Sequence, residues 1–518
     1  MVLLTEHQTC LARCTTFEQN VYAPYQIDHA TRADLKGSTC PMKRGSNWGS
    51  VFTVLKIETT NVRFQLVYES PRGPPTRAVC KSYEMAVEIE LNSDRFVQLL
   101  GKLIGEAKYL QNNPPKFIPQ EDRAIQHVKE VLEPFSTAKG GPIQIDHVTF
   151  VEGRGNLILT YNPSGSKRTV AFVGSHLDVV PANPETWNHD PFSLTVEGDK
   201  LYGRGTTDCL GHVALITDLF AQLAEKKVSL NFSLVAVFIA SEENTSIPGV
   251  GVEKLVELGK LDHLRDGPVY WVDSADSSPC MGTASAAMWT LRAEGRLFHS
   301  GLPHKGINSQ EFVNEAVAYL QKRFYEDFPP HPKETEYKFA TPSTMKPTLI
   351  KCSEGSVNQI PPWTEVQGDI RLTPFYNIDE CVKKVEGYVK KINDDPTILP
   401  TRGPCSKYVI TAEGVEYRAK LEFKLNGSPL RGIACNLEST GYKHLEAASS
   451  EVLGAASQPY SLTGSLPLVG DLQAAGFDIQ VCGYGHTSVY HGNNEYCSLS
   501  CMKNAMKIFS LLLNKHNA

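Results

Sequence analysis

The sequence predicts an α/β protein in which helices cover both faces of a mostly parallel sheet, with a smaller domain inserted. Two observations support this class. The segments 232–240 and 269–272 are apolar almost throughout, as in strands that are buried on both faces. Between such strands lie segments with apolar residues at helical spacing, for example 211–223. Strands that alternate with helices along a chain are typical of a parallel sheet between two helical layers.

The first 88 residues are predicted to be loosely ordered, and helices are predicted to follow them. Residues 1–88 contain turn residues and one strand-like run, Val51 to Tyr68, and we expect a poorly ordered extension. Order is predicted to begin near Ser93, a candidate N-cap before apolar residues at helical spacing. A second helix is expected over Pro119 to Val131. The segment 89–284 forms the first part of the main domain, and its predicted strands are 170–173, 232–240 and 269–272.

The middle of the chain, residues 285–435, follows a different pattern. A strand at 289–294 alternates apolar and polar residues, and a helix, two strands, a second helix and a further strand come after it. This β-α-β-β-α-β order is that of the split ferredoxin-like unit, so we predict an inserted domain. The pattern of the main domain resumes over 436–518, with a helix up to Leu453 and a strand at 479–483.

Length and composition limit the classes of function. With 518 residues, the chain is long enough for more than one domain. Hydrophobic residues make up 41% and charged residues 21%, which is typical of globular proteins. The formal charge of −6 gives no basic surface for nucleic acid, and apolar runs such as 234–240 are too short to span a bilayer. We therefore expect neither a nucleic-acid partner nor a membrane segment.

Cysteine usage and the N-terminus predict the compartment. The 13 cysteines are scattered without a repeating framework, which favours free thiols in a reducing environment. The N-terminus lacks the charged-then-apolar pattern of a signal peptide. We expect a cytoplasmic protein, and import into an organelle stays open.

Histidine and carboxylate side chains follow four predicted strands of the main domain. They are, in strand order, His176 with Asp178, Glu242 with Glu243, Asp273, and His486 with His491. A tight loop over 203–208 delivers Asp208 just before a helix. Ligands of an open parallel sheet bind outside the carboxyl ends of its strands, so these side chains are expected to converge.

Each of these residues alone has an ordinary structural explanation, such as a solvated surface charge or, for Asp208, the N-cap of the following helix. Together, at four strand ends, they predict a metal site. Imidazole and carboxylate suit zinc and similar divalent ions, and several acids with two histidines suit a pair of ions. Such a pair needs a bridging carboxylate and a general base beside the attacking water. An adjacent Glu-Glu pair supplies that base if one member binds metal.

Three motifs resemble a known family: GSHLDVVP at 174–181, GRGTTD at 203–208 and SEE at 241–243. They are similar to those of the co-catalytic metallopeptidases and deacylases, the group of aminoacylases, carboxypeptidases and desuccinylases. The resemblance extends from near Phe96 to the C-terminus. It implies a zinc-exopeptidase-like main domain and an inserted domain that acts as a lid and joins two chains in a homodimer.

The resemblance also implies roles for individual residues of the main domain. Two divalent ions per chain are implied, with zinc as the first choice and cobalt or manganese as alternatives. The implied metal ligands are His176, Asp208 as the bridge, Glu243, Asp273 and His491. The implied general base is Glu242, and Asp178 orients the His176 imidazole. Asp276 is an alternative to Asp273 as a metal ligand. His491 is favoured over His486 as the last ligand, because the Asn-Glu-Tyr that follows His491 matches the family.

The resemblance assigns three residues of the inserted domain. His299 matches the lid histidine that stabilises the developing oxyanion. Asn358 and Arg371 lie where the family binds the carboxylate of its substrate, although surface polar residues at strand ends explain them equally well. The turn 463–467 departs from the family, because it replaces a glycine-rich, acid-containing turn.

The implied activity is hydrolysis of an amide in a small acyl amino acid. Four long stretches match the deacetylases of the family, namely 204–214, 238–252, 324–347 and 368–377. This resemblance implies removal of acetate from N2-acetylornithine in arginine biosynthesis. A broader aminoacylase or a dipeptidase on the same scaffold is an alternative. A catalytically silent binding protein is another, although the complete set of site residues argues against it.

Overall fold

The computed structural model describes residues 14–16, 19–21, 39–40, 52–53, 87–162 and 164–518. Before residue 87 it describes two antiparallel strand pairs, β1 (Cys14–Thr16) with β2 (Gln19–Val21) and β3 (Thr39–Cys40) with β4 (Phe52–Thr53). Apart from these pairs, residues 1–86 of the predicted poorly ordered extension, with most of the strand-like run 51–68, lie outside the described residues. The predicted boundary at residue 88 is wrong by two positions, because residues 87 and 88 belong to the ordered chain and Val87 is buried.

The main domain is built on an eight-stranded sheet of order β21-β12-β22-β11-β7-β10-β6-β5. Its central strands β22, β11, β7 and β10 are mutually parallel, and β6, β5 and β12 add antiparallel pairings on either side. The strand bounds are β5 (Ile143–Val151), β6 (Arg154–Tyr161), β7 (Thr169–His176), β10 (Ser233–Ile239), β11 (Pro268–Val272), β12 (Cys280–Thr283), β21 (Tyr460–Leu462) and β22 (Asp478–Cys482). The predicted α/β class with a mostly parallel sheet is confirmed.

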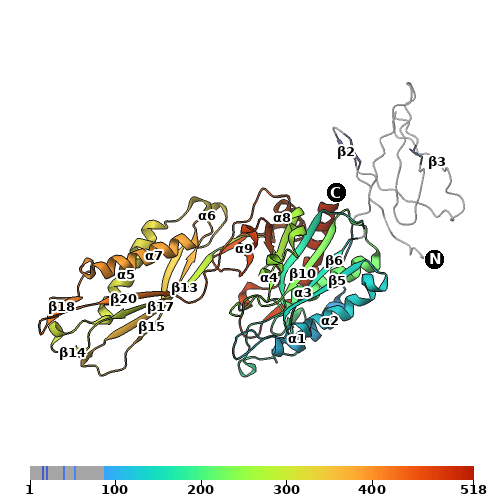
Figure 1. Cartoon of the computed structure of the whole chain (residues 1–518). Helices are drawn as coiled ribbons and strands as arrows, with labels where there is room; N and C mark the ends of the chain where they lie inside the picture. Colours follow the sequence, from blue (N-terminus) through green and yellow to red (C-terminus); the bar gives the residue numbers. More distant parts are fainter. Residues whose placement is uncertain (1–13, 17–18, 22–38, 41–51, 54–86, 163) are drawn as a thin grey trace. The chain divides into compact units, whose positions relative to one another are not determined.

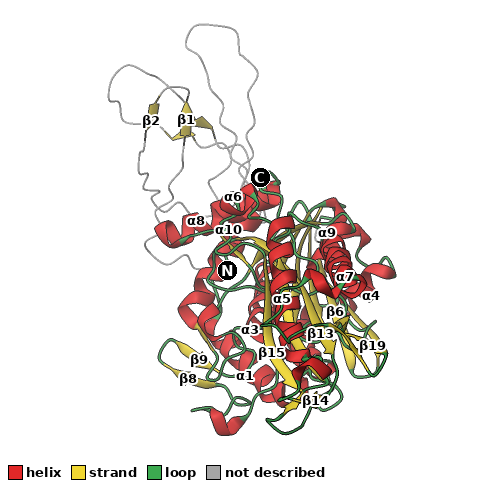
Figure 2. Cartoon of the chain, turned by 90° about the vertical axis from the view of Figure 1, so that its left-hand side faces the viewer, coloured by secondary structure: helices red, strands yellow, loops and turns green. Residues whose placement is uncertain are grey.

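Alternate residues of the central strands enter two separate cores. In β10, Leu234, Ala236 and Phe238 pack into the layer that contains α1, α2, α3, α8 and α10, whereas Val235, Val237 and Ile239 pack against α4 and α9. Because both faces are buried, six consecutive residues of the strand, 234–239, are apolar. Figure 2 shows the strands of this sheet between the helices.

The main domain has a helix close to each predicted helical segment and two helices, α9 and α10, that were not predicted. The helix bounds are α1 (Ser93–Leu110), α2 (Asp122–Leu132), α3 (Leu210–Lys226), α4 (Val252–Glu257), α8 (Thr440–Leu453), α9 (Val469–Ala474) and α10 (Leu499–Asn517). Ser93 was predicted as the N-cap of α1, and this prediction is wrong. The N-cap is Asn92, whose side chain accepts the Arg95 N–H at 3.1 Å. Asparagine is among the best N-cap residues, so the correction moves the cap by one position.

The β5–β6 hairpin was not predicted. Only one face of β5 is buried, and its exposed positions carry polar residues such as Gln144 and Asp146. A three-stranded sheet of β23 (Tyr496–Ser498), β9 (Lys200–Tyr202) and β8 (Thr195–Glu197) completes the domain. Within the described part of the chain the cysteines are free thiols, and none of its helices is long and apolar enough to cross a membrane.

The inserted domain has the predicted ferredoxin-like order. Its antiparallel sheet runs β15-β17-β13-β20, and α5 and α7 pack on one face of it around a separate apolar core (Figure 1). The bounds are β13 (Ser285–Glu294), α5 (Ser309–Asp327), β15 (Thr344–Cys352), β17 (Trp363–Leu372), α7 (Ile378–Asp394) and β20 (Lys420–Leu425). Smaller elements are β14 (Phe298–His299) paired with β16 (Gln359–Ile360), α6 (Pro332–Glu336), and β18 (Val409–Ala412) paired with β19 (Val415–Arg418).

The segment 87–91 packs on helix α10. The Val87 N–H donates to Asn514 Oδ1 at 2.6 Å, and the Ser510 hydroxyl donates to the Val87 carbonyl at 2.6 Å. Val87, Ile89 and Leu91 are all buried. A truncation that is meant to spare the main domain therefore has to end at residue 86 rather than at residue 88.

Deletion of residues 1–86 is expected to leave the free energy of unfolding and the activity unchanged, because the segment 87–91 stays in place. Deletion of residues 1–91 removes three buried apolar side chains, each of which contributes about 1.5–3 kcal/mol to stability. Chemical denaturation of both truncated chains, compared with the full chain, measures the difference. Insolubility of the 1–86 deletion, or inactivity at full metal occupancy, would show that the N-terminal residues also support the main domain.

Candidate metal centre

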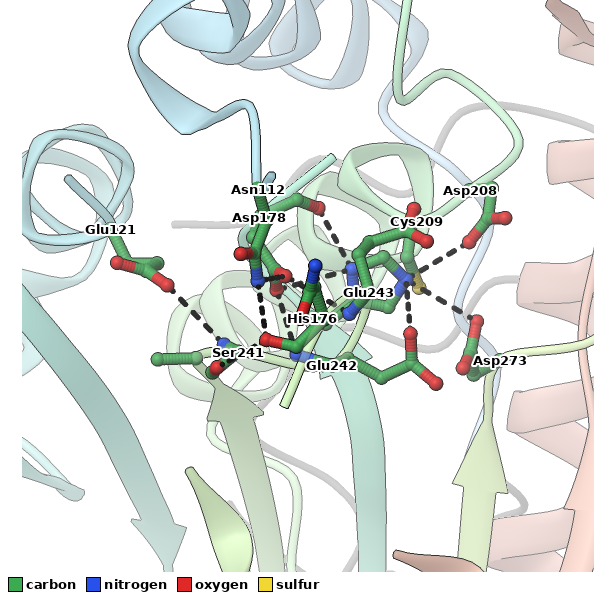
Figure 3. A network of polar contacts seen from close by, with 12 residues as sticks. Asn112, Glu121, His176, Asp178, Asp208, Cys209, Ser241, Glu242, Glu243 and Asp273 are labelled. Atoms are coloured by element: carbon green, nitrogen blue, oxygen red, sulfur yellow. Dashed lines mark hydrogen bonds and ion pairs between the residues drawn. The ribbon is translucent and has the colours of Figure 1, made fainter. Parts of the chain in front are cut away.

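The predicted metal-site residues of the main domain come together at the carboxyl end of the central sheet (Figure 3). His176 is the last residue of β7, Glu242 and Glu243 follow β10, and Asp273 follows β11. Because β7 is the parallel neighbour of both β10 and β11, the three strand ends meet at one edge. Asp208 reaches the same place from the loop before α3.

The first half of the cluster surrounds the buried imidazole of His176. Its Nε2 lies 2.9 Å from Asp208 Oδ1 and 3.6 Å from Asp273 Oδ1. Asp276, the alternative to Asp273, instead accepts hydrogen bonds from the backbone and hydroxyl of Thr487, at 3.2 and 2.6 Å. The geometry therefore brings Asp273, and not Asp276, beside His176.

The second half of the cluster forms around His491. Its Nε2 lies 3.1 Å from Asp208 Oδ2 and 3.2 Å from Glu243 Oε2. The two oxygens of the Asp208 carboxylate thus face different histidines. His486 is outside the cluster, since its Nε2 contacts the Ser498 hydroxyl at 2.8 Å.

Asp178 contacts both His176 and the turn that carries the glutamates. The nearer group to His176 Nδ1 is the Asp178 backbone carbonyl, at 2.8 Å, while its carboxylate oxygen Oδ1 lies 3.6 Å away. The carboxylate accepts the backbone N–H groups of Glu242 and Glu243 at 3.1 and 3.0 Å, and an N–H of the Asn112 side chain at 2.7 Å. Asp178 therefore holds the imidazole mainly through its carbonyl and holds the glutamate turn through its side chain.

Glu495 fixes the loop that presents Asp208, a role that the sequence did not reveal. This buried carboxylate accepts the backbone N–H groups of Gly205, Thr207 and Asp208 at 3.1, 2.8 and 3.0 Å. Arg204 donates to it at 2.7 Å. The only signal in the sequence is that Glu495 follows His491 within one short motif.

The cluster carries more negative charge than its histidines can balance. Burial and the charge of Asp273 raise the pKa of Glu242 well above its usual range. Burial and the charge of Asp208 raise the pKa of Glu243 to about 7, and burial raises that of Asp273 to about 6 although His176 opposes this. Carboxyl groups whose pKa is raised by burial and by neighbouring negative charge indicate a place where additional positive charge would be stabilised.

The pKa of Asp208, which lies between the two histidines, shifts in the opposite direction. Burial disfavours charge on Asp208, but hydrogen bonds from His176 and His491 hold its pKa well below the usual range. The hydrogen bonds of His491 to Asp208 and Glu243 raise the pKa of that imidazole to about 10. The Asp208 carboxylate thus has an imidazole nitrogen within 2.9 Å on one side and 3.1 Å on the other.

The donor set fits divalent metal ions. His176, Asp208 and Glu243 offer ligand atoms that lie within 4.8 Å of one another, and so do His176, Cys209 and Asp273. The buried Glu242 Oε1 has no hydrogen-bond partner among the described residues. Imidazole nitrogen with carboxylate oxygen is the ligand combination of zinc and related ions.

The three predicted residues of the inserted domain lie in two places outside the metal cluster. The Ser300 N–H donates to the Asn358 carbonyl at 2.9 Å, which places Asn358 beside the loop of the exposed His299. Arg371 donates to Asp369 at 2.7 Å and to the Ser465 hydroxyl at 3.4 Å, within the turn 463–467. Within residues 87–162 and 164–518, no hydrogen bond or ion pair joins these side chains to the metal cluster.

The fold and the cluster together define a hydrolase that binds metal at the carboxyl end of an α/β sheet. A family model described as "Peptidase family M20/M25/M40" matches residues 172–515, and the chain belongs to this family. The predicted family and enzyme class are thereby confirmed.

Relatives in the same family cover most of the chain. An acetylornithine deacetylase of Arabidopsis thaliana is 52% identical over 82% of this chain and 96% of its own length. One of Dictyostelium discoideum is 54% identical over 81% of this chain and 96% of its own. The crystal structure of human carnosine dipeptidase 1 shares the fold, with a TM-score of 0.60 over 82% of this chain and 96% of that one, at 18% identity.

Proposed function

We propose that the chain hydrolyses N2-acetylornithine to acetate and ornithine, as a step of arginine biosynthesis. The observation that carries this is the identity of 52% and 54% to two acetylornithine deacetylases, each matched over 96% of its length. The family model, which matches residues 172–515, spans the whole cluster of histidines and carboxylates.

The proposed metal ligands follow from the contacts within the cluster. His176 and Asp273 would hold one ion, and Glu243 and His491 would hold the other. Asp208 would bridge them, because its two oxygens face the two histidines at 2.9 and 3.1 Å. Zinc suits this set of ligands, with cobalt or manganese as alternatives. When bound, the ions polarise the acetyl carbonyl and make a water molecule nucleophilic at neutral pH.

In this mechanism, Glu242 moves the proton. Its carboxylate takes a proton from the attacking water and passes it to the α-amino nitrogen as the amide bond breaks. Asp178 keeps Glu242 and Glu243 in place through their backbone N–H groups.

His299 is the proposed donor to the carbonyl oxygen. Its Nδ1 accepts the Gly301 N–H at 2.9 Å, so the neutral imidazole carries its proton on Nε2 and presents that atom as a donor. Asn358 and Arg371 are proposed to bind the substrate's carboxylate, with Arg371 exchanging part of its pairing with Asp369.

The proposal is tested by measuring amine release from N2-acetylornithine, other N-acetyl amino acids and dipeptides. Zinc, cobalt and manganese are added back separately to the metal-free protein. The highest kcat/KM is expected for N2-acetylornithine. A preference for dipeptides, or equal rates on many N-acetyl amino acids, would contradict the proposed substrate and support the broader alternatives.

The chain is also proposed to act as a homodimer joined by its inserted domains. This rests on the family that the sequence resembles, in which the lid histidine of one chain serves the active site of the other. The exposure of His299, and the lack of a hydrogen bond from it to the cluster within the described residues, support the same arrangement here.

Subunit exchange is expected to restore activity to a mixture of two inactive variants, His299→Ala and Glu242→Gln. A mixed dimer has one site with both groups intact and one site with neither. After random exchange of equal amounts, about one quarter of the wild-type activity should return, since half of the dimers are mixed. If exchange is verified by mass spectrometry and no activity returns, His299 does not act across the dimer.

A further inference from the structure

The turn that carries the two glutamates is held by a pair of buried carboxylates. Asp178 accepts the N–H groups of Glu242 and Glu243, and Glu121 Oε1 accepts the preceding one, that of Ser241, at 3.2 Å. In Figure 3, Glu121 lies to the left of Ser241 and Asp178 lies above the turn. Three consecutive backbone amides are therefore bound by side chains rather than by the sheet.

Ser241 needs such support because of its backbone conformation. Its φ is +62°, in the left-handed region that residues other than glycine rarely adopt. A residue in that region is strained and persists only where the surroundings hold it. The conformation of Ser241 sets the direction in which the chain leaves β10, and so the directions of the Glu242 and Glu243 side chains.

Glu121 is in turn held by Arg154. Arg154 Nε lies 3.0 Å from Glu121 Oε2, and Arg154 Nη2 lies 2.6 Å from Glu121 Oε1. Both residues are buried, at 0% and 1% exposure. Although Glu121 directly precedes α2, its side chain makes no capping hydrogen bond to that helix. A buried ion pair is a weak source of stability, so its geometry suggests another role.

We propose that Glu121, held by Arg154, is a positioning residue that fixes the Ser241 peptide and thereby aims Glu242 and Glu243 into the metal centre. This inference rests on the proposed function for its effect on catalysis. Its structural part concerns only the chain itself. Glu121 touches no reacting atom and acts through the turn.

The matched control is the pair of Asp218 and Arg95. Asp218 is likewise a buried carboxylate that accepts an arginine N–H, at 2.6 Å, and a backbone N–H, that of Asn92, at 3.0 Å. It joins α1 to α3 and contacts no residue of the metal cluster. Asp218→Asn therefore reports what the loss of a buried charge does to stability alone.

The test compares Glu121→Gln with Asp218→Asn. The side-chain oxygen of a glutamine can still accept a hydrogen bond from the Ser241 N–H or from Arg154. Its NH2 group cannot accept one, so a contact with the arginine N–H donors is lost. In Glu121→Gln, we expect kcat for N2-acetylornithine and the affinity for added zinc to fall about 10–100-fold with KM little changed. Asp218→Asn is expected to lower the melting temperature with kcat and zinc affinity unchanged.

Hydrogen exchange of the metal-free protein separates this inference from the proposed function. Peptides covering 241–243 should exchange faster in Glu121→Gln, and not in Asp218→Asn. That outcome would support the positioning role even if N2-acetylornithine proved not to be the substrate. Unchanged exchange together with unchanged zinc affinity would overturn it. If Glu121→Gln does not fold, Arg154→Lys, which keeps the charge and loses the paired contact, decides by the same measurements.

Discussion

Asp208→Ala is expected to yield a protein that holds neither metal ion and has no detectable hydrolase activity. The two oxygens of this carboxylate lie 2.9 and 3.1 Å from the imidazoles of His176 and His491, and no other side chain of the cluster contacts both. In the proposed centre, one shared carboxylate binds both ions and offsets their mutual repulsion. Its loss therefore removes both ions together.

Metal analysis of the purified variant checks this expectation. The control is Asp276→Ala, because Asp276 is an acid near the cluster that binds Thr487 and no histidine. The control should keep its metal and most of its activity. An Asp208→Ala protein that retains two ions per chain would disprove the bridging role, and loss of metal in the control would revive Asp276 as a ligand.

Glu242→Gln is expected to behave differently, with full metal content and a turnover lower by at least about 10²–10⁴-fold. The amide keeps the size of the side chain but cannot take a proton from water. The proposed ligands stay in place, because Asp178 binds the backbone N–H of residue 242 and not its side chain. Steady-state kinetics and metal analysis of the same preparation measure both effects.

The comparison variant is Glu243→Gln, which changes the neighbouring residue by the same single atom. Glu243 Oε2 lies 3.2 Å from His491 Nε2, so this variant is expected to lose the ion on that side. If Glu242→Gln loses metal and Glu243→Gln does not, the roles of the two glutamates are reversed.

The parts of the fold that were predicted are those with a local pattern. Strand β10 is apolar from Leu234 to Ile239 because both of its faces are covered, and β17 alternates because only one face is. The β5–β6 hairpin escaped prediction because β5 is largely exposed and its sequence has little apolar periodicity. The position of a strand end also indicated where His176 and Asp273 would meet.

The supporting residues could not be predicted, because their partners are distant in sequence. Glu121 reaches the Ser241 amide across 120 residues, and glutamate at the start of a helix is an ordinary surface residue. Glu495 binds the amide of Asp208 across 287 residues. A carboxylate that accepts a backbone N–H leaves no periodicity or motif, because every residue except proline offers such a donor.

The contact between Arg204 and Glu495 has a consequence for the order of events during synthesis. These residues are 291 positions apart, and the entire inserted domain lies between them. Domains emerge and fold from the N-terminus first, so the strands with His176, Glu242 and Asp273 are available long before His491. In a nascent chain, the part of the site with His176, Glu242 and Asp273 therefore stays incomplete until the segment with His491 has been made. Tight binding of both proposed ions would then require that the C-terminal segment has packed onto the domain.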